Sequence, residues 1–240
     1  MMTIRRTLAA ATAIATLALA SPAFADAITL DAGDVGQRFT LDYNGFADGQ
    51  TIDNLSATTT FTLTGIDGNS YKFDYSVTNT TSDPLTSRVS SFAFNTDPNI
   101  VSATSTGAFA FTTLSSNYPN GIGTVDVCFK DASTGSCAGG GSGGLTKGQT
   151  GTGTFTLTFS QPVSSLTLSD FFDRYQSITG AGGVSSASGS GTMTSGGSTG
   201  GTPVPEPGML GLFGLGLAGL AFARRRRTPS LRPMAMPLPA

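Results

Sequence analysis

Apolar and polar residues alternate with a period of two over long stretches of this chain, and that pattern limits the fold most strongly. In two of these runs the apolar positions are Phe39, Leu41 and Tyr43, and then Tyr71, Phe73, Tyr75 and Val77. Successive side chains of a β-strand point to opposite faces, so the alternation places an apolar face against a core and a polar face toward water. Asp67-Gly68 precedes the second run and predicts a hairpin turn.

The same pattern continues through the rest of the body and predicts about eight short strands. The further segments are Val89 to Asn95, Gly107 to Leu114, Thr124 to Lys130, Thr154 to Ser160 and Ser164 to Asp170. Strands with one apolar face need a second layer to cover that face, so the predicted fold is all-β, an antiparallel β-sandwich or its jelly-roll variant. Residues 171–176 fit either a helical turn or a bent strand end.

The N-terminus has the pattern of a secretory signal peptide. Arg5 and Arg6 precede an Ala/Leu-rich run, and Ala23-Phe24-Ala25 is a small-x-small cleavage site. We therefore expect residues 1–25 to be a signal peptide that signal peptidase removes, with cleavage after Ala25 and a mature chain that begins at Asp26.

The C-terminus has three parts in a fixed order. Val204-Pro205-Glu206-Pro207 precedes an apolar run from Gly208 to Ala223, and the arginines Arg224, Arg225, Arg226 and Arg227 follow. A helix over the apolar run would reach about 24 Å, short of the ~30 Å hydrocarbon core, so it predicts a single, weakly anchored transmembrane helix. The arginines fix the cytoplasmic side.

This order resembles the PEP-CTERM sorting signal of bacteria that secrete exopolysaccharide. The resemblance implies that Pro-Glu-Pro lies next to an exosortase cleavage site and that the apolar run holds the protein transiently in the inner membrane. Residues 228–240 depart from the pattern, because that signal normally stops at its basic cluster; they are expected to be a Pro-rich disordered tail.

Between the two ends, residues 26–179 are expected to form the β-sandwich domain and residues 180–203 a flexible linker. The linker is predicted because its Gly, Ser, Thr and Ala cannot bury enough apolar surface to offset the entropy of ordering. Residues 204–227 are the sorting signal.

The charge of the body excludes one class of partner. Six basic residues and fourteen aspartates lie between Asp26 and Arg174, so the body has a net charge of −8. Nucleic acids require a basic surface, and no nucleic-acid partner is expected.

Cys128 and Cys137 are the two cysteines of the chain. An even pair in an exported protein predicts a disulfide, which should stabilise the fold by roughly 2–3 kcal/mol. Two free thiols or a metal-binding pair are the alternatives, although the chain has no histidine to complete a zinc site.

Three segments of the second half resemble the cistern family of PEP-CTERM proteins. They are Val127 to Phe129, Cys137 to Gly144 and Ser165 to Ile178. The resemblance implies an exported, exosortase-processed protein and brings no catalytic residues.

Catalytic chemistry has few candidates here. The body has no histidine, glutamate or tryptophan, which removes histidine-based triads. Asp170 and Asp173 beside Tyr175 are the remaining acid pair of the kind a glycosidase uses, but we predict no enzyme. No cofactor or metal is expected; Ca²⁺ is a weak alternative at Asp31/Asp34, at Asp67/Asn69 or in the loop from Asn95 to Asn99.

Two functions remain as hypotheses. The first is a non-catalytic surface or extracellular-matrix protein associated with exopolysaccharide or biofilm, found in the cell envelope or released. The second is a carbohydrate-binding module for the cell's own exopolysaccharide. Its candidate stacking residues are Tyr43, Tyr71, Tyr75, Tyr118 and Tyr175, but three of these tyrosines are in line with inward-facing Phe or Leu, which favours a place in the core.

Overall fold

The computed structural model describes residues 26–133, 136–137, 139–140 and 142–196, and these residues fold almost entirely as β-strands. Two 3-10 helices, η1 (Ala32–Asp34) and η2 (Gly107–Phe109), interrupt them. The strands are β1 (Ala27–Asp31), β2 (Arg38–Ala47), β3 (Gln50–Asp67), β4 (Ser70–Asn79), β5 (Thr86–Asp97), β6 (Ser102–Ser105), β7 (Phe111–Tyr118), β8 (Gly123–Lys130), β9 (Leu145–Thr146), β10 (Thr150–Thr158), β11 (Ser165–Thr179) and β12 (Ser186–Ser195).

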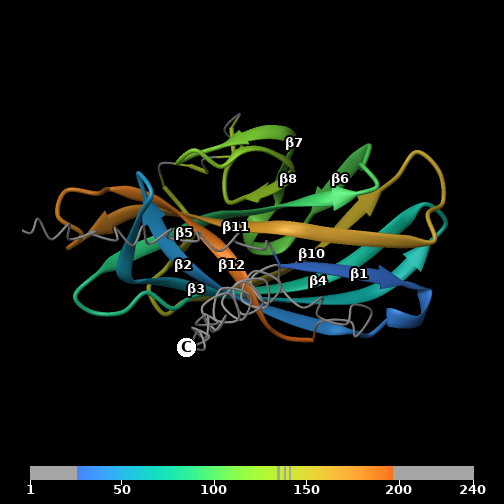
Figure 1. The fold of residues 1–240 in the computed structure, drawn as a ribbon, viewed down its shortest axis with the longest axis horizontal. Coiled ribbons are helices and arrows are strands. Elements are labelled where there is room, and N and C mark those ends of the chain that lie inside the picture. The colour runs from blue at the N-terminus through green and yellow to red at the C-terminus, as the bar shows by residue number, and fades with distance from the viewer. Residues whose placement is uncertain (1–25, 134–135, 138, 141, 197–240) are drawn as a thin grey trace, which may run out of the picture. The chain divides into compact units, whose positions relative to one another are not determined.

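All described strands belong to one hydrogen-bonded antiparallel sheet (Figure 1). Its order is β6-β10-β4-β3-β2-β12-β11-β5-β8-β7, with β1 also paired to β11 and β9 to β5. The predicted all-β, antiparallel class is confirmed, and so is the predicted hairpin, because β3 turns into β4 at Gly68 and Asn69.

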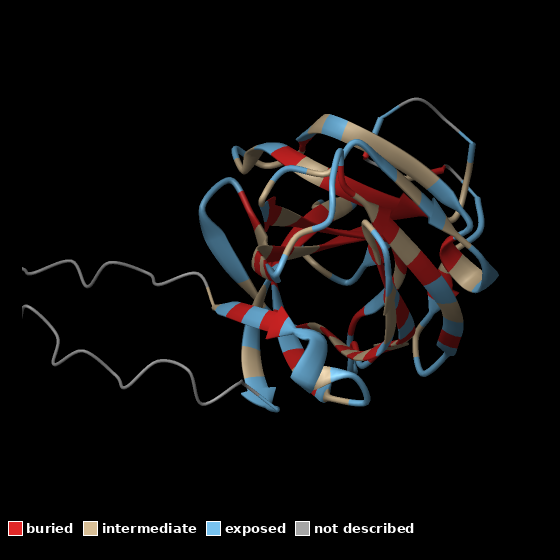
Figure 2. Ribbon diagram, turned by 90° about the vertical axis from the view of Figure 1, so that its right-hand side faces the viewer, coloured by how far each residue is buried: buried red, intermediate tan, exposed pale blue. Residues whose placement is uncertain are grey.

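The sheet curls until its two walls face each other. Strands β10, β4, β3 and β2 form one wall, β11, β5 and β8 form the other, and β12 pairs with both β2 and β11. On the opposite side the edge strands approach, where Thr112 Oγ1 on β7 donates to the Ala103 carbonyl on β6 at 3.1 Å. The two layers expected of a sandwich are thus parts of one nearly closed sheet, and Figure 2 shows the buried residues inside it.

Phenylalanine rings from both walls fill the interior. Phe61 on β3 lies 5.5 Å from Phe92, 5.7 Å from Phe155 and 6.2 Å from Phe171, measured between ring centroids. All four rings are buried. Full burial of such a ring contributes roughly 1.5–3 kcal/mol, so the alternation seen in the sequence supplies the main stabilising term.

The structure corrects three local predictions. The segment predicted as a flexible linker from residue 180 contains β12, a central strand. The segment from Gly107 to Leu114 is not one strand, since η2 precedes β7. Residues 171–176 continue β11 through a register shift between Ser169 and Phe172, so the bent strand is the right alternative.

The alternation pattern did not predict β12, because this strand has almost no apolar residues. Its small residues are required by the close packing of its neighbours. A Cβ at Gly189 would lie 2.5 Å from the Asn44 carbonyl oxygen and 2.9 Å from the Tyr175 ring. A Cβ at Gly191 would lie 2.9 Å from the Tyr43 ring. The large rings of neighbouring strands occupy the space that side chains of β12 would need.

The signal peptide of residues 1–25, the sorting signal of residues 204–227 and the tail of residues 228–240 lie outside the described residues. So does the predicted transmembrane run from Gly208 to Ala223. Among the described residues, no helix has the length and apolar character needed to cross a membrane.

Candidate functional site

The three segments that resemble the cistern family meet around β5. β8 pairs with one edge of β5 and β11 pairs with the other. The glycine-containing loop that follows Cys137 lies against β5 itself. A Cβ at Gly139 would lie 2.5 Å from Ser90 Oγ, and one at Gly144 would lie 2.4 Å from the Val89 carbonyl oxygen. Only glycine permits so close an approach, so these positions fix the loop against the strand.

A disulfide begins this loop. Cys128 on β8 is bonded to Cys137, with 5.9 Å between their Cα atoms, and both residues are fully buried. The predicted pairing is confirmed. The bridge packs with Ala93, Tyr118 and Val125 in a small apolar cluster of its own.

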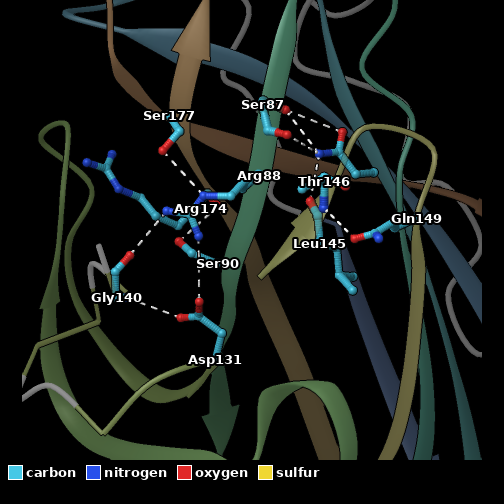
Figure 3. A network of polar contacts seen from close by, with 11 residues as sticks. Ser87, Arg88, Ser90, Asp131, Gly140, Leu145, Thr146, Gln149, Arg174 and Ser177 are labelled. Atoms are coloured by element: carbon cyan, nitrogen blue, oxygen red, sulfur yellow. Dashed lines mark hydrogen bonds and ion pairs between the residues drawn. The ribbon is translucent and has the colours of Figure 1, made fainter. Parts of the chain in front are cut away.

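A buried ion pair holds the same loop at Gly140 (Figure 3). Arg88 Nη1 lies 3.9 Å from Asp131 Oδ2, and both side chains are largely shielded from water. Asp131 Oδ1 accepts a hydrogen bond from the Gly140 amide at 3.1 Å, and Arg88 Nε donates to Ser177 Oγ at 3.3 Å. The network therefore ties β5, β11, the residue after β8 and the loop together.

A second network joins the end of β4 to β5 and β9, and Figure 3 labels its residues Ser87 and Leu145. Asn79 Nδ2 donates to the Ser87 carbonyl at 3.1 Å and to the Leu145 carbonyl at 2.9 Å. Asn79 is fully buried, so these bonds satisfy a side chain that water cannot reach.

The two acidic residues proposed as a catalytic pair, Asp170 and Asp173, lie in different surroundings. Asp170 is half-buried and accepts a hydrogen bond from Asn95 Nδ2 at 2.9 Å. Asp173 is fully buried, and neither of its carboxylate oxygens has a hydrogen-bond partner among the described residues. Burial raises the pKa of Asp173 well above its usual range, which favours the neutral acid. With no solvent exposure, Asp173 does not face a cleft where a substrate could meet it.

Arg174 links β11 to β12. It is 7% exposed, and its Nη2 donates to Ser186 Oγ at 2.9 Å. With the Asn120 amide turned so that its oxygen faces the guanidinium, that oxygen accepts from Arg174 Nη1 at 3.0 Å. Arg174 thus has a structural role in holding β12 and the turn after β7.

The tyrosines proposed as sugar-stacking residues are all core residues. None of Tyr43, Tyr71, Tyr75, Tyr118 and Tyr175 is more than 3% exposed. Tyr75 hydroxyl, for example, accepts from the Phe109 amide at 2.8 Å and donates to the Thr106 carbonyl at 2.7 Å. The core position that the sequence favoured for these rings is confirmed, and they form no exposed sugar-binding platform.

The residues considered as calcium ligands bind other groups of the protein. Asp31 and Asp34 form the capping box of η1. Asp67 lies 3.4 Å from Lys72 Nζ, and Asn69 donates to the Phe159 carbonyl. Asn95 binds Asp170 and the Asp126 amide. In the part of the chain that the structure describes, no three His, Cys, Asp or Glu residues are grouped as a metal site would require.

A hydroxyl-lined groove on the outer face of β10, β4, β3 and β2 was not predicted. Its volume is about 500 Å³, and its lining includes Thr60, Thr62, Ser76, Thr152 and Thr154 together with Arg38 and Asp74. The signal was present in the sequence, because these residues occupy the polar positions of the alternating runs.

Comparison with protein families bears on the C-terminal segment. Residues 203–227 match the PEP-CTERM protein-sorting motif. The chain carries a PEP-CTERM sorting motif. The match includes the residues from Val204 to Pro207 and the four arginines from Arg224 to Arg227. It does not cover the segments that resemble the cistern family, which stays a prediction. No curated protein and no solved structure matches the chain.

A PEP-CTERM motif at the C-terminus indicates export, transient membrane anchoring and processing by exosortase on the way to the cell surface or the extracellular space. The chain is therefore an exosortase-processed secreted protein.

Proposed function

We propose that the body of this chain is a non-catalytic surface or extracellular-matrix protein that acts in association with exopolysaccharide or biofilm. The PEP-CTERM motif is the main support for the proposal, because it indicates export to the cell surface or the extracellular space. The body is a disulfide-bonded sheet in which Asp173 is fully buried and Asp170 is hydrogen-bonded to Asn95, which supports a role in binding or assembly.

The processing steps follow from the two ends of the chain. Signal peptidase cuts between Ala25 and Asp26, and exosortase cuts next to the residues from Val204 to Pro207. The arginines from Arg224 to Arg227 keep the C-terminal side in the cytoplasm until that cut. Calcium and other cofactors have no part in this proposal.

Fractionation of the producing bacterium tests the proposal. The body should be found in the envelope surface or matrix of wild-type cells and should accumulate in the inner membrane when exosortase is deleted. A deletion of the gene for this chain should alter the matrix or the biofilm. An unchanged location in the exosortase mutant would contradict the processing step, and an unchanged biofilm would contradict the matrix role.

A carbohydrate-binding function is the second candidate, and the hydroxyl-lined groove favours it in place of the tyrosines. The groove offers threonine and serine hydroxyls together with one guanidinium and one carboxylate, which are donors and acceptors suited to a polyhydroxylated chain. A glycan array with the body should then give sugar-specific signals that Thr62→Val and Arg38→Ala reduce. Thr167→Val, on β11 and outside the groove, is the matched control.

A further inference from the structure

The turn between β7 and β8 carries an Asn-Gly pair. Asn120 and Gly121 lie in this turn with φ angles of 62° and 80°, in the left-handed region. Asparagine and glycine adopt this conformation more readily than other residues, which explains their use in the turn. The pair also has a chemical property. A glycine nitrogen can reach the side-chain amide of the asparagine before it, because no Cβ obstructs the approach.

The side-chain carbonyl of Asn120 lies among three hydrogen-bond donors. With the amide turned so that its oxygen faces the guanidinium, this oxygen accepts from Arg174 Nη1 at 3.0 Å, from the Ser188 amide at 2.8 Å and from Ser188 Oγ at 3.1 Å. Arg174 and Ser188 are both buried. Donors fixed around a carbonyl oxygen stabilise the negative charge that this oxygen gains when a nucleophile attacks the carbonyl carbon. The donors therefore activate Asn120 Cγ toward attack.

Gly121 can supply the nucleophile. It is exposed, and a Cβ built on it would have no atom within 4 Å. In the part of the chain that the structure describes, its amide donates no backbone hydrogen bond. The peptide can therefore rotate toward the Asn120 side chain without displacing a neighbour, and water reaches the turn.

The second Asn-Gly pair of the sequence, Asn44-Gly45, lies in contrasting surroundings. Gly45 is a buried residue of β2 that pairs with Ile52 on β3, and a Cβ there would lie 2.3 Å from Leu55 Cδ2. Asn44 Oδ1 accepts from the Ser190 amide at 3.2 Å. Packing and strand pairing hold the Gly45 peptide in place, so its nitrogen cannot turn toward Asn44 Cγ. The same dipeptide is thus held in one place and free in the other.

Arg174 lacks the partner that a reaction at Asn120 would create. Among the described residues it forms no ion pair with a carboxylate, and its Nε has no hydrogen-bond partner. Burial lowers the pKa of this guanidinium from its ordinary value. A buried cation without a counter-charge is costly. A carboxylate in place of the Asn120 amide would lie about 3 Å from Arg174 Nη1 and would supply the counter-charge.

We propose that Asn120 is a self-modification site that converts to aspartate through a cyclic imide, and that the new carboxylate pairs with Arg174 and holds β12 to the turn. In the first step the Gly121 nitrogen bonds to Asn120 Cγ, and Nδ2 leaves as ammonia with the proton of the Gly121 amide. In the second step water adds to Cγ, the Cγ–N bond breaks, and the nitrogen takes a proton back. The three donors bind the oxygen on Cγ, so water attacks there and aspartate forms in preference to isoaspartate.

Mass spectrometry of freshly made protein from the producing bacterium tests the conversion, with fragmentation that separates aspartate from isoaspartate. During incubation at mildly alkaline pH, Asn120 should convert about tenfold faster than Asn44 or more, because fixed donors activate its carbonyl. The folded protein should give mainly aspartate at position 120. The same chain unfolded in urea lacks the three donors and should give a larger share of isoaspartate.

Ser188→Ala removes one of the three donors and should slow the conversion of Asn120 about tenfold. Ser190→Ala, the same substitution at an exposed position of β12, is the matched control and should leave the rate unchanged. Conversion of Asn120 no faster than that of Asn44, equal rates in the two serine variants, or a mainly isoaspartate product from the folded protein would overturn the proposed modification.

Asn120→Asp tests the effect of the product on the fold. It should raise the urea midpoint of unfolding above that of unconverted protein, and Arg174→Gln should abolish the gain. Asn44→Asp, at the other Asn-Gly pair, should give no gain. An equal gain with and without Arg174 would overturn the pairing.

A second measurement decides the pairing if Arg174→Gln does not fold. In Asn120→Asp, NMR titration should place the pKa of the new carboxyl below the ordinary value of aspartate, because the guanidinium favours its charged form. A pKa at or above the ordinary value would overturn the pairing.

Discussion

Gly189 on β12 lies opposite Asp173 on β11, and this pair brings a strand without side-chain bulk against the most buried carboxyl group of the body. The sheet closes on this side because glycine lets β12 pass between Asn44 and Tyr175.

Gly189→Val should therefore destabilise the body. The new side chain would meet the Asn44 carbonyl and the Tyr175 ring, and overpacking of this kind costs typically 1–3 kcal/mol or more. Urea unfolding of the body, residues 26–202, measures the change. Ser190→Val serves as the control, because Ser190 is exposed, and a similar loss in both variants would contradict the steric account.

Asp173 should make the body less stable as pH rises. Its folded-state pKa is raised by burial, so its contribution to stability is fully present below the unfolded pKa, near 4, and is lost as pH rises toward the folded pKa. The phenols of Tyr43, Tyr118 and Tyr175 face Asp173, and their pKa values are raised by burial first and by Asp173 second. These phenols stay neutral in this range and do not produce the effect.

Asp173→Asn keeps the shape and removes the ionisation. It should stabilise the body at pH 8 by roughly 1–3 kcal/mol and flatten stability between pH 5 and pH 8. Thermal unfolding across that range measures both effects. Asp74→Asn, on the exposed face of β4, is the control. An unchanged pH dependence in Asp173→Asn would show that another group is responsible.

Arg88→Leu should loosen the loop that follows the disulfide. Removing one partner of a buried ion pair leaves the other charge uncompensated, which costs roughly 3–5 kcal/mol. Hydrogen exchange should show faster exchange of the Gly140 amide, which donates a hydrogen bond to Asp131.

Adding Asp131→Asn to Arg88→Leu should recover part of the lost stability, because the uncompensated charge is gone while an oxygen remains for Gly140. A double variant less stable than Arg88→Leu alone would contradict this assignment.

Reduction of the Cys128–Cys137 bond should lower the free energy of unfolding by about 2.5 kcal/mol, as expected for a loop of this length. A Cys128→Ser/Cys137→Ser variant should behave like the reduced protein and should no longer respond to reductant. An equal response of that variant and the wild type to reductant would contradict the prediction.

Much of the fold could be predicted because alternation is a local signal. The runs around Phe39 and Phe73 identify strands without knowledge of their neighbours, and Asp67-Gly68 identifies the turn between β3 and β4. The pairing of Cys128 with Cys137 followed from their number and from the export signal.

What could not be predicted depends on partners distant in sequence. β12 has Gly189 and Gly191 where a strand would usually have apolar side chains. The rings of Tyr43 and Tyr175 explain why these positions are glycine, since they leave no room for a side chain. The burial of Tyr118 and Tyr175 is also non-local, because one face of a strand can be exposed or covered by a wall that sequence periodicity does not reveal. The hydroxyl-lined groove needs the register of β10, β4 and β3, which is also non-local.

The most direct test of processing at both ends is the intact mass of the protein purified from the producing bacterium, with and without exosortase. The wild-type product should begin at Asp26 and end next to the Pro-Glu-Pro segment, whereas the product of the exosortase mutant should begin at Asp26 but retain the sorting segment. The same C-terminus at Ala240 in both strains would contradict it.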